Sequence, residues 1–142
     1  AESLSTSPNH FGPATQLVAI VPAGKARATL TRIRSELGDF NVIQTTSPLD
    51  GESTWIEIFP LSVSKSQTSA WLADKLSIPK QHTVAVGNDY NDLDLLEWSA
   101  NSYVVANAPE DLKKRFTNVA SNNKGGVAEA AARWLSGMTI DD

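Results

Sequence analysis

The densest group of polar residues in the chain runs from Gly87 to Asp92 and reads GNDYND. It directly follows the apolar run 83–86 and precedes a segment with helical spacing. In an open parallel α/β sheet, ligands bind beyond the carboxyl ends of the strands, where such a loop presents its oxygen atoms. Carboxylate and amide oxygens suit Mg²⁺, which completes its shell with water and substrate phosphate. The alternative is that these residues only form a turn and cap the next helix.

Two further segments could contribute to the same chemistry. Lys65 stands at the start of a predicted helix, where an ammonium group and backbone amides can meet a phosphate together. The polar, glycine-rich segment 121–126 precedes the last helix and could line a pocket. Taken singly, a lysine is usually a solvated surface group and such a segment is usually a connection, so neither is specific by itself.

Composition excludes several other classes of protein. The 142 residues contain no cysteine, which rules out disulfide scaffolds, thiolate zinc sites and cysteine nucleophiles. His10 and His82 are the only histidines, too few for a multi-histidine metal centre. The net charge is −4 and the basic residues are dispersed, so we expect no nucleic-acid partner. No apolar run approaches the length of a membrane span, and we expect a cytoplasmic protein without a membrane partner.

The first part of the chain predicts a small α/β unit. Residues 1–14 are expected to form a flexible tail. A strand over 16–21 is followed by a helix over 25–37, and the segments 40–46 and 53–60 are predicted to pair antiparallel through the turn at Asp50-Gly51. Within the last strand, Trp55, Glu57 and Phe59 share one face and Ile56 and Ile58 the other, which leaves the environment of Glu57 ambiguous.

After residue 62 the pattern changes to helices alternating with short apolar strands, which predicts a parallel sheet covered by helices. Ser64 is expected to cap a helix that runs to about Leu76. Strands over 83–86 and 102–106 alternate with helices over 91–98 and 109–116. A final helix carries an apolar stripe at helical spacing and ends near Gly137; its stripe residues are Val127, Ala130, Ala131, Trp134 and Leu135.

Taken in order, these segments resemble the C-terminal half of the haloacid dehalogenase-like hydrolases, specifically the Cof-type phosphatases with a type IIB α/β cap. The resemblance covers about residues 15–136. It rests on four segments in the family's order: the strand 55–60 followed by Val63-Ser-Lys65, the Gly-Asp-x-x-Asn-Asp-like loop 87–92, Asn107-Ala108 at a strand end, and the closing segment 121–128. The resemblance implies a cap remnant over 15–62, namely a strand, a helix and a hairpin, and the C-terminal part of a Rossmann-like parallel-sheet core over 63–142.

The resemblance also implies residue roles and a cofactor. Lys65 and Asp92 are the expected catalytic residues. Lys65, Asn91 and Asn122 are expected to bind phosphate or substrate, and Asn88, Asp89 and Asp92 to hold Mg²⁺. The implied activity is Mg²⁺-dependent hydrolysis of a small phosphorylated metabolite such as a sugar phosphate.

Two features of this chain depart from the family pattern. The family has Asp directly after the loop glycine, whereas this chain has Asn88, whose amide oxygen brings no charge to the metal. The family's Asp-x-Asp-Gly segment, which carries the nucleophile, is absent from the sequence.

We therefore expect a fragment that is inactive without the N-terminal half of the same enzyme, a view that fits the first residue, Ala1, and the single methionine, Met138. A homodimer through exposed sheet edges is expected for the isolated chain. The alternative function is a binding domain that kept the fold and lost the chemistry.

Overall fold

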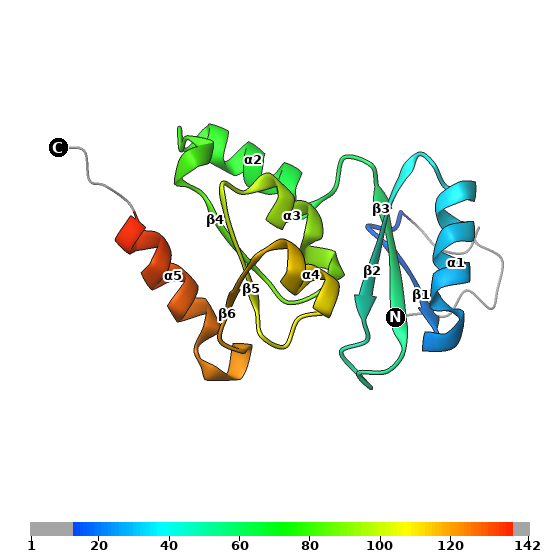
Figure 1. Ribbon diagram of the computed structural model, residues 1–142. Coiled ribbons are helices and arrows are strands. Elements are labelled where there is room, and N and C mark those ends of the chain that lie inside the picture. Colours follow the sequence, from blue (N-terminus) through cyan, green and yellow to red (C-terminus); the bar gives the residue numbers. More distant parts are fainter. Residues whose placement is uncertain (1–12, 138–142) are drawn as a thin grey trace.

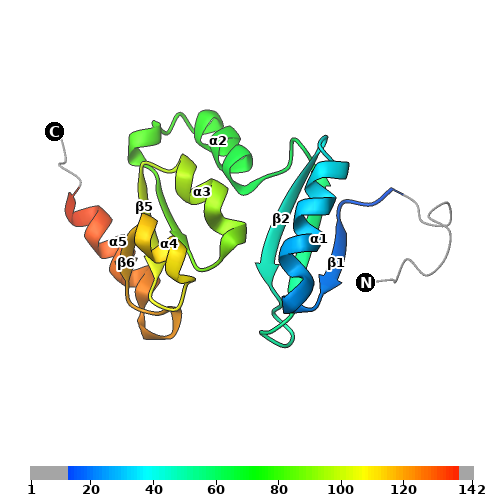
Figure 2. The same cartoon turned by 45° about the vertical axis from the view of Figure 1, so that its right-hand side comes forward.

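The computed structural model describes residues 13–137, which form two α/β parts side by side (Figures 1 and 2). Most of the predicted tail, including His10, lies outside the described residues, as does Met138. Among the described residues, each helix is too short or too polar to pass through a lipid bilayer.

The first part is an antiparallel sheet with one helix on it. Strands β1 (Leu17–Val21), β3 (Thr54–Pro60) and β2 (Phe40–Thr46) lie in the order β1-β3-β2. Helix α1 (Ala23–Glu36) covers one face, where Val21, Val42 and Ile56 form a small core with Leu30 and Ile33. The predicted order of strand, helix and antiparallel pair is confirmed, although the helix begins two residues earlier than the spacing indicated.

The packing of α1 decides which face Glu57 occupies. Ile56 is completely buried beneath α1, so its neighbour Glu57 belongs to the opposite face, as strand alternation requires. In the antiparallel register Glu57 lies beside Ile43 of β2 and Val18 of β1. On the face turned away from α1, the carboxylate of Glu57 therefore has the apolar residues Ile43 and Val18 as its direct cross-strand neighbours.

The second part is a parallel sheet covered by helices on both sides. Strands β4 (Val84–Gly87), β5 (Asn101–Val105) and β6 (Thr117–Val119) lie in the order β4-β5-β6 within the described residues. Helices α3 (Leu93–Trp98) and α4 (Glu110–Arg115) lie on one side of this sheet and α5 (Gly126–Gly137) on the other, with α2 (Lys65–Lys75) outside α3 (Figure 1). Short 3₁₀ turns span Lys80–His82, Tyr90–Asp92 and Asn122–Lys124.

The core of this second part confirms the predicted α/β class. It is built from small and branched apolar side chains of the sheet, of three helices and of the connection after β5: Ala85, Leu96, Val104, Val105, Ala108, Leu112, Val119 and Ala130. Strand β6 was not predicted, because three residues are too few for a period of two to be recognised. In α5, Ala130 is fully buried, whereas Val127 and Leu135 of the predicted stripe are each 60% exposed.

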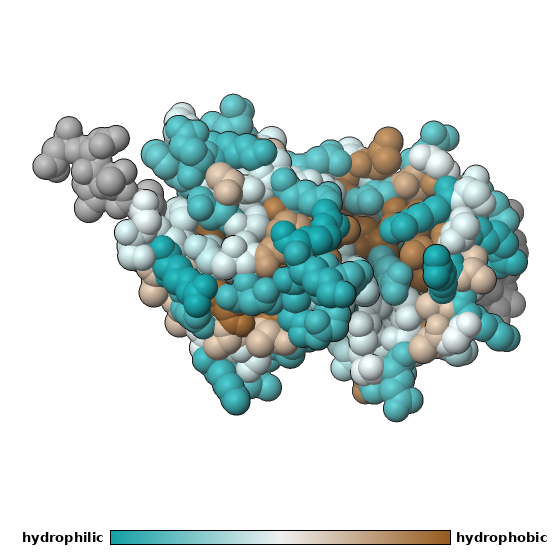
Figure 3. Space-filling model, in the orientation of Figure 1, coloured by the Kyte–Doolittle hydropathy of each residue, from teal (hydrophilic) through white to brown (hydrophobic). Residues whose placement is uncertain are grey.

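The chain crosses from one sheet to the other over residues 61–64. The predicted division between a cap remnant and a core lies in this connection. On the face drawn in Figure 3, the larger hydrophobic area lies at the junction of the two parts and beside it on the first part, and a smaller one lies on the second part. The junction of the two parts is therefore a candidate region for a binding site.

Candidate functional site

The loop after β4 is held by the carboxylate of Asp92. Its Oδ2 accepts a hydrogen bond from the backbone N–H of Asn88 at 2.9 Å, and the residue is only 7% exposed. Gly87 makes this close approach possible, because a Cβ at that position would lie 2.8 Å from the Cβ of Asp92 and 2.9 Å from a methyl group of Leu96. The glycine at the strand end thus lets the loop fold back tightly on itself.

Lys65, the first residue of α2, contacts this loop through its side chain. Ser64 caps the helix by accepting a hydrogen bond from the backbone N–H of Gln67 at 3.1 Å. The Lys65 Nζ donates a hydrogen bond to Asp92 Oδ1 and forms an ion pair with it. The expected juxtaposition of Lys65 and Asp92 at one edge is confirmed. The Lys65 side chain is 46% exposed and that of Asp92 11%, so the ammonium group stays accessible from solvent while its partner is buried.

A second contact joins α2 to α3 and was not foreseen from the sequence. The backbone N–H of Ser66 donates to Asp94 Oδ2 at 3.0 Å. Burial raises the pKa of Asp94, but hydrogen bonds from Ser66 and Ser64 outweigh it and leave that pKa below its usual value. This contact fixes the first turn of α2 and so places Lys65. Asp94 looks like an ordinary first-turn helix residue, so no sequence signal singled it out.

Asp89 faces the first part of the molecule. Its Oδ2 accepts hydrogen bonds from the backbone N–H of Thr46 at 2.7 Å and from the Thr45 hydroxyl at 3.3 Å. Its Oδ1 accepts from the backbone N–H of Tyr90 at 2.7 Å. These donors occupy both oxygens of a carboxylate that is 7% exposed. A role for Asp89 as a metal ligand remains a prediction, and it would compete with three hydrogen bonds.

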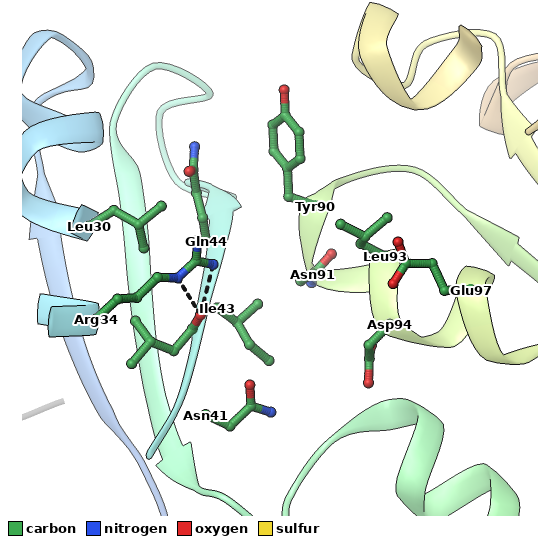
Figure 4. A pocket seen from close by; sticks show the side chains of 11 residues that line it. Leu30, Arg34, Asn41, Ile43, Gln44, Tyr90, Asn91, Leu93, Asp94 and Glu97 are labelled. Carbon is green, nitrogen blue, oxygen red and sulfur yellow. Dashed lines mark hydrogen bonds between the residues drawn. The ribbon is translucent and has the colours of Figure 1, made fainter. Parts of the chain in front are cut away.

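Asn91 lines two cavities between the parts. One, of about 440 Å³, is also lined by Lys65. The other, of about 280 Å³, is drawn in Figure 4, where Asn91, Leu93 and Asp94 face Ile43 and Asn41 across the gap. On its first-part side, the Arg34 guanidinium donates to the carbonyl oxygen of Val42 at 3.0 and 3.3 Å and so braces α1 against β2 (Figure 4).

Tyr90, beside Asn91, points towards α4. Its hydroxyl donates to the Asp111 carboxylate at 3.0 Å. Burial, together with this bond to Asp111, raises the pKa of Tyr90. The phenol therefore stays protonated and ties the loop to the start of α4.

Asn122 follows β6, at the same carboxyl edge of the sheet as the loop 88–92. Its backbone N–H donates to the side-chain oxygen of Asn107 at 3.0 Å, and Asn107 follows β5. Three loops after three parallel strands therefore lie along one edge, as expected for a ligand site of this sheet class. Asn122 is exposed, and the hydrogen bonds found among residues 13–137 do not join it to Lys65 or Asp92.

A family model described as haloacid dehalogenase-like hydrolase matches residues 6–130. The chain belongs to this family. The resemblance inferred from the four sequence segments is therefore confirmed, and the mixed α/β fold matches solved structures of these hydrolases.

Relatives within the haloacid dehalogenase-like hydrolases include enzymes named as phosphatases. The chain is 37% identical over 84 residues to the 5-amino-6-(5-phospho-D-ribitylamino)uracil phosphatase YwtE of Bacillus subtilis, a match that covers 58% of the chain and 29% of that enzyme. The chain thus spans less than a third of this relative's length.

Solved structures of this family share the fold of the chain. A haloacid dehalogenase-like hydrolase from B. subtilis superposes with a TM-score of 0.68 at 26% identity, over 81% of this chain and 39% of that one. A subclass IIB sugar phosphatase shares the fold, with a TM-score of 0.69 at 14% identity over 84% of this chain and 43% of that one.

The donor set for a metal in this hydrolase chain is small. Among residues 13–137, no three histidine or acidic side chains cluster closely enough to hold an ion by themselves. Asp92 and the exposed Asn88 could provide one carboxylate and one amide oxygen at the loop. That set fits Mg²⁺, which takes one or two carboxylates and fills its remaining positions with water and phosphate.

Proposed function

We propose that the full-length protein containing this chain is a Mg²⁺-dependent phosphatase that acts on a small phosphorylated metabolite such as a sugar phosphate. The attacking aspartate would lie outside this chain. The observation that carries the proposal is the ion pair between Lys65 and the buried Asp92 at the carboxyl edge of a parallel sheet. A fixed, half-exposed cation at that edge suits a phosphoryl group, whose transfer depends on positioning and charge stabilisation.

Each site residue has a role in this proposal. Lys65 binds a phosphoryl oxygen and the nucleophile, while Asp92 holds the ammonium group in place. Asn88 and Asp92 hold Mg²⁺ directly or through water, with Asp89 as a further predicted ligand. Asn91 and Asn122 bind phosphate or substrate from neighbouring loops. Mg²⁺ supplies positive charge that neutralises the phosphoryl oxygens.

The proposed enzyme also has expected partners and an expected location. Its partners are a small phosphorylated metabolite and the N-terminal half of the same enzyme. The net charge of −4 argues against a nucleic-acid partner, and the absence of cysteine is consistent with a cytoplasmic location.

A non-catalytic binding domain is the second candidate. Asn88, in the position where the family has aspartate, favours it, because the loop then has one carboxylate fewer for the metal. The two functions differ in turnover, since only the phosphatase releases phosphate.

The test is hydrolysis of p-nitrophenyl phosphate by the full-length protein with Mg²⁺ and with EDTA. We expect Mg²⁺-dependent turnover that falls about 100-fold or more in Lys65→Ala and in Asp92→Asn, as for loss of a charge-stabilising group. Lys75→Ala is the matched control, because Lys75 ends the same helix and lies over the ring of Trp71, 4.7 Å from its centroid. No turnover in the wild type, or equal turnover in Lys65→Ala and Lys75→Ala, would contradict the proposed phosphatase activity.

A further inference from the structure

The cavity of about 440 Å³ has two chemically different walls. Lys65 and Asn91, the proposed phosphate-binding residues, line it together with the connection and first turns of α2. The opposite wall is the face of the antiparallel sheet turned away from α1, which contributes Ile43, Glu57 and Phe59. The volume lies in the range of pockets that hold small ligands. A phosphate at Lys65 would direct the rest of its ester towards this wall.

Glu57 is the acidic side chain in the lining of this cavity. It lies in the middle of β3, between Ile43 and Val18 in the register. Glutamate is disfavoured inside strands, and its placement among apolar neighbours carries a desolvation cost. Glu57 therefore occupies a strand position at which an apolar side chain would be the more usual choice.

The internal contacts of Glu57 do not neutralise it. Its Oε1 accepts a long hydrogen bond of 3.3 Å from the side chain of Gln16, an exposed neighbour. The ion pairs found within residues 13–137 do not include Glu57, and Lys65 pairs with Asp92 instead. The carboxylate thus keeps unused acceptor capacity on a cavity wall.

We propose that Glu57 selects the leaving group of the substrate. The pocket accepts phosphate esters whose leaving group is uncharged or cationic and carries hydroxyl or amino donors, and it rejects esters whose leaving group carries a carboxylate. The carboxylate of Glu57 accepts hydrogen bonds from such donors, and Phe59 and Ile43 contact the carbon skeleton. A carboxylate on the ligand would face a like charge in a partly desolvated pocket, which is strongly unfavourable. This inference rests on the proposed function.

A matched pair of ligands tests the inference in the full-length protein. Glycerol 3-phosphate and 3-phosphoglycerate share a three-carbon skeleton and differ in a terminal hydroxymethyl or carboxylate group. Their dissociation constants are measured by calorimetry in EDTA, so that no turnover occurs. We expect the wild type to bind glycerol 3-phosphate about tenfold more tightly. In Glu57→Gln the ratio should fall towards one, chiefly through tighter binding of 3-phosphoglycerate.

The control is Glu36→Gln, which removes one negative charge from the end of α1, on the side of the sheet away from the cavity. It should leave the ratio of the two dissociation constants unchanged. The inference is overturned if the wild type binds neither ligand or prefers 3-phosphoglycerate, or if Glu57→Gln leaves the ratio within twofold of the wild type. Turnover of p-nitrophenyl phosphate by the same wild type reports separately on the phosphatase function, because it does not depend on these ratios.

Discussion

The backbone N–H of Thr46, at the end of β2, donates a 2.7 Å hydrogen bond to Asp89 Oδ2 in the loop after β4. The bond joins residues 43 positions apart, one at the end of a strand of the first sheet and the other in the loop after a strand of the second. The loop that carries Asp92 is thereby attached directly to the sheet that carries Glu57. The position of one cavity wall relative to the other depends on this attachment.

Asp89→Asn should destabilise the full-length protein by about 1–3 kcal/mol, because at this buried position an amide NH₂ would replace one acceptor and face a backbone N–H donor. Urea denaturation measures the free energy of unfolding. Asp39→Asn, an exposed position between α1 and β2, is the matched control and should change it by less than about 0.5 kcal/mol. Equal effects of the two substitutions would contradict a structural role of the Asp89 bonds.

Asn88→Asp should strengthen Mg²⁺ binding about tenfold in the full-length protein, because it adds a carboxylate beside Asp92. Calorimetric titration with Mg²⁺ measures this affinity. Asn123→Asp adds the same charge in the exposed loop after β6 and should leave the affinity nearly unchanged. Should the two variants bind Mg²⁺ equally, the loop 88–92 would not be the metal site.

Gly87→Ala should destabilise the protein by about 1–3 kcal/mol, because the new methyl group would overlap the side chains of Asp92 and Leu96. Gly38→Ala is the control, since a Cβ there meets no atom within 4 Å. Thermal unfolding followed by circular dichroism compares the two variants. A Gly87→Ala protein as stable as Gly38→Ala would show that the loop does not need the close approach.

Asp94→Asn should lower the melting temperature at pH 7 by about 2 °C, a small effect because much of the carboxyl group remains screened by solvent. Hydrogen bonds from Ser66 and Ser64 hold the pKa of Asp94 below its usual value in the folded state. Such a group stabilises the fold above its unfolded pKa of about 4, and this contribution is lost as the pH falls through the folded pKa.

The difference in melting temperature between the wild type and Asp94→Asn should therefore shrink from pH 7 towards pH 3. Asp74→Asn, an exposed position near the other end of α2, should show no such convergence. A difference that stays constant over this pH range would mean that ionised Asp94 does not stabilise the start of α2.

The chain expressed alone should form dimers or larger assemblies, because within the described residues β4 pairs on one side only, with β5. It should also fail to hydrolyse p-nitrophenyl phosphate. Size-exclusion chromatography and a phosphatase assay check both points. A stable monomer that unfolds cooperatively would contradict the first, and sustained hydrolysis that Lys65→Ala abolishes would contradict the second.

Local patterns were sufficient to predict most elements and the loop 87–92. The apolar run before Gly87 and the spacing after Asp92 are properties of neighbouring residues, so they can be read without knowing the fold. The order of four short segments indicated the family and singled out Lys65. Strand β6 was not predicted, because its three residues form too short a pattern. Asp94 was not singled out, because an acidic residue is common in the first turn of a helix.

The sequence by itself determined the class of fold and the polar loop at a strand end, and it predicted the residues that would contact a phosphate. Only the tertiary structure brought Lys65 to Asp92, attached Asp89 to Thr46 and placed Glu57 on the cavity wall rather than beneath α1. These relationships join residues far apart in the chain. They depend on how the two sheets and their helices pack, which local propensity and periodicity do not specify.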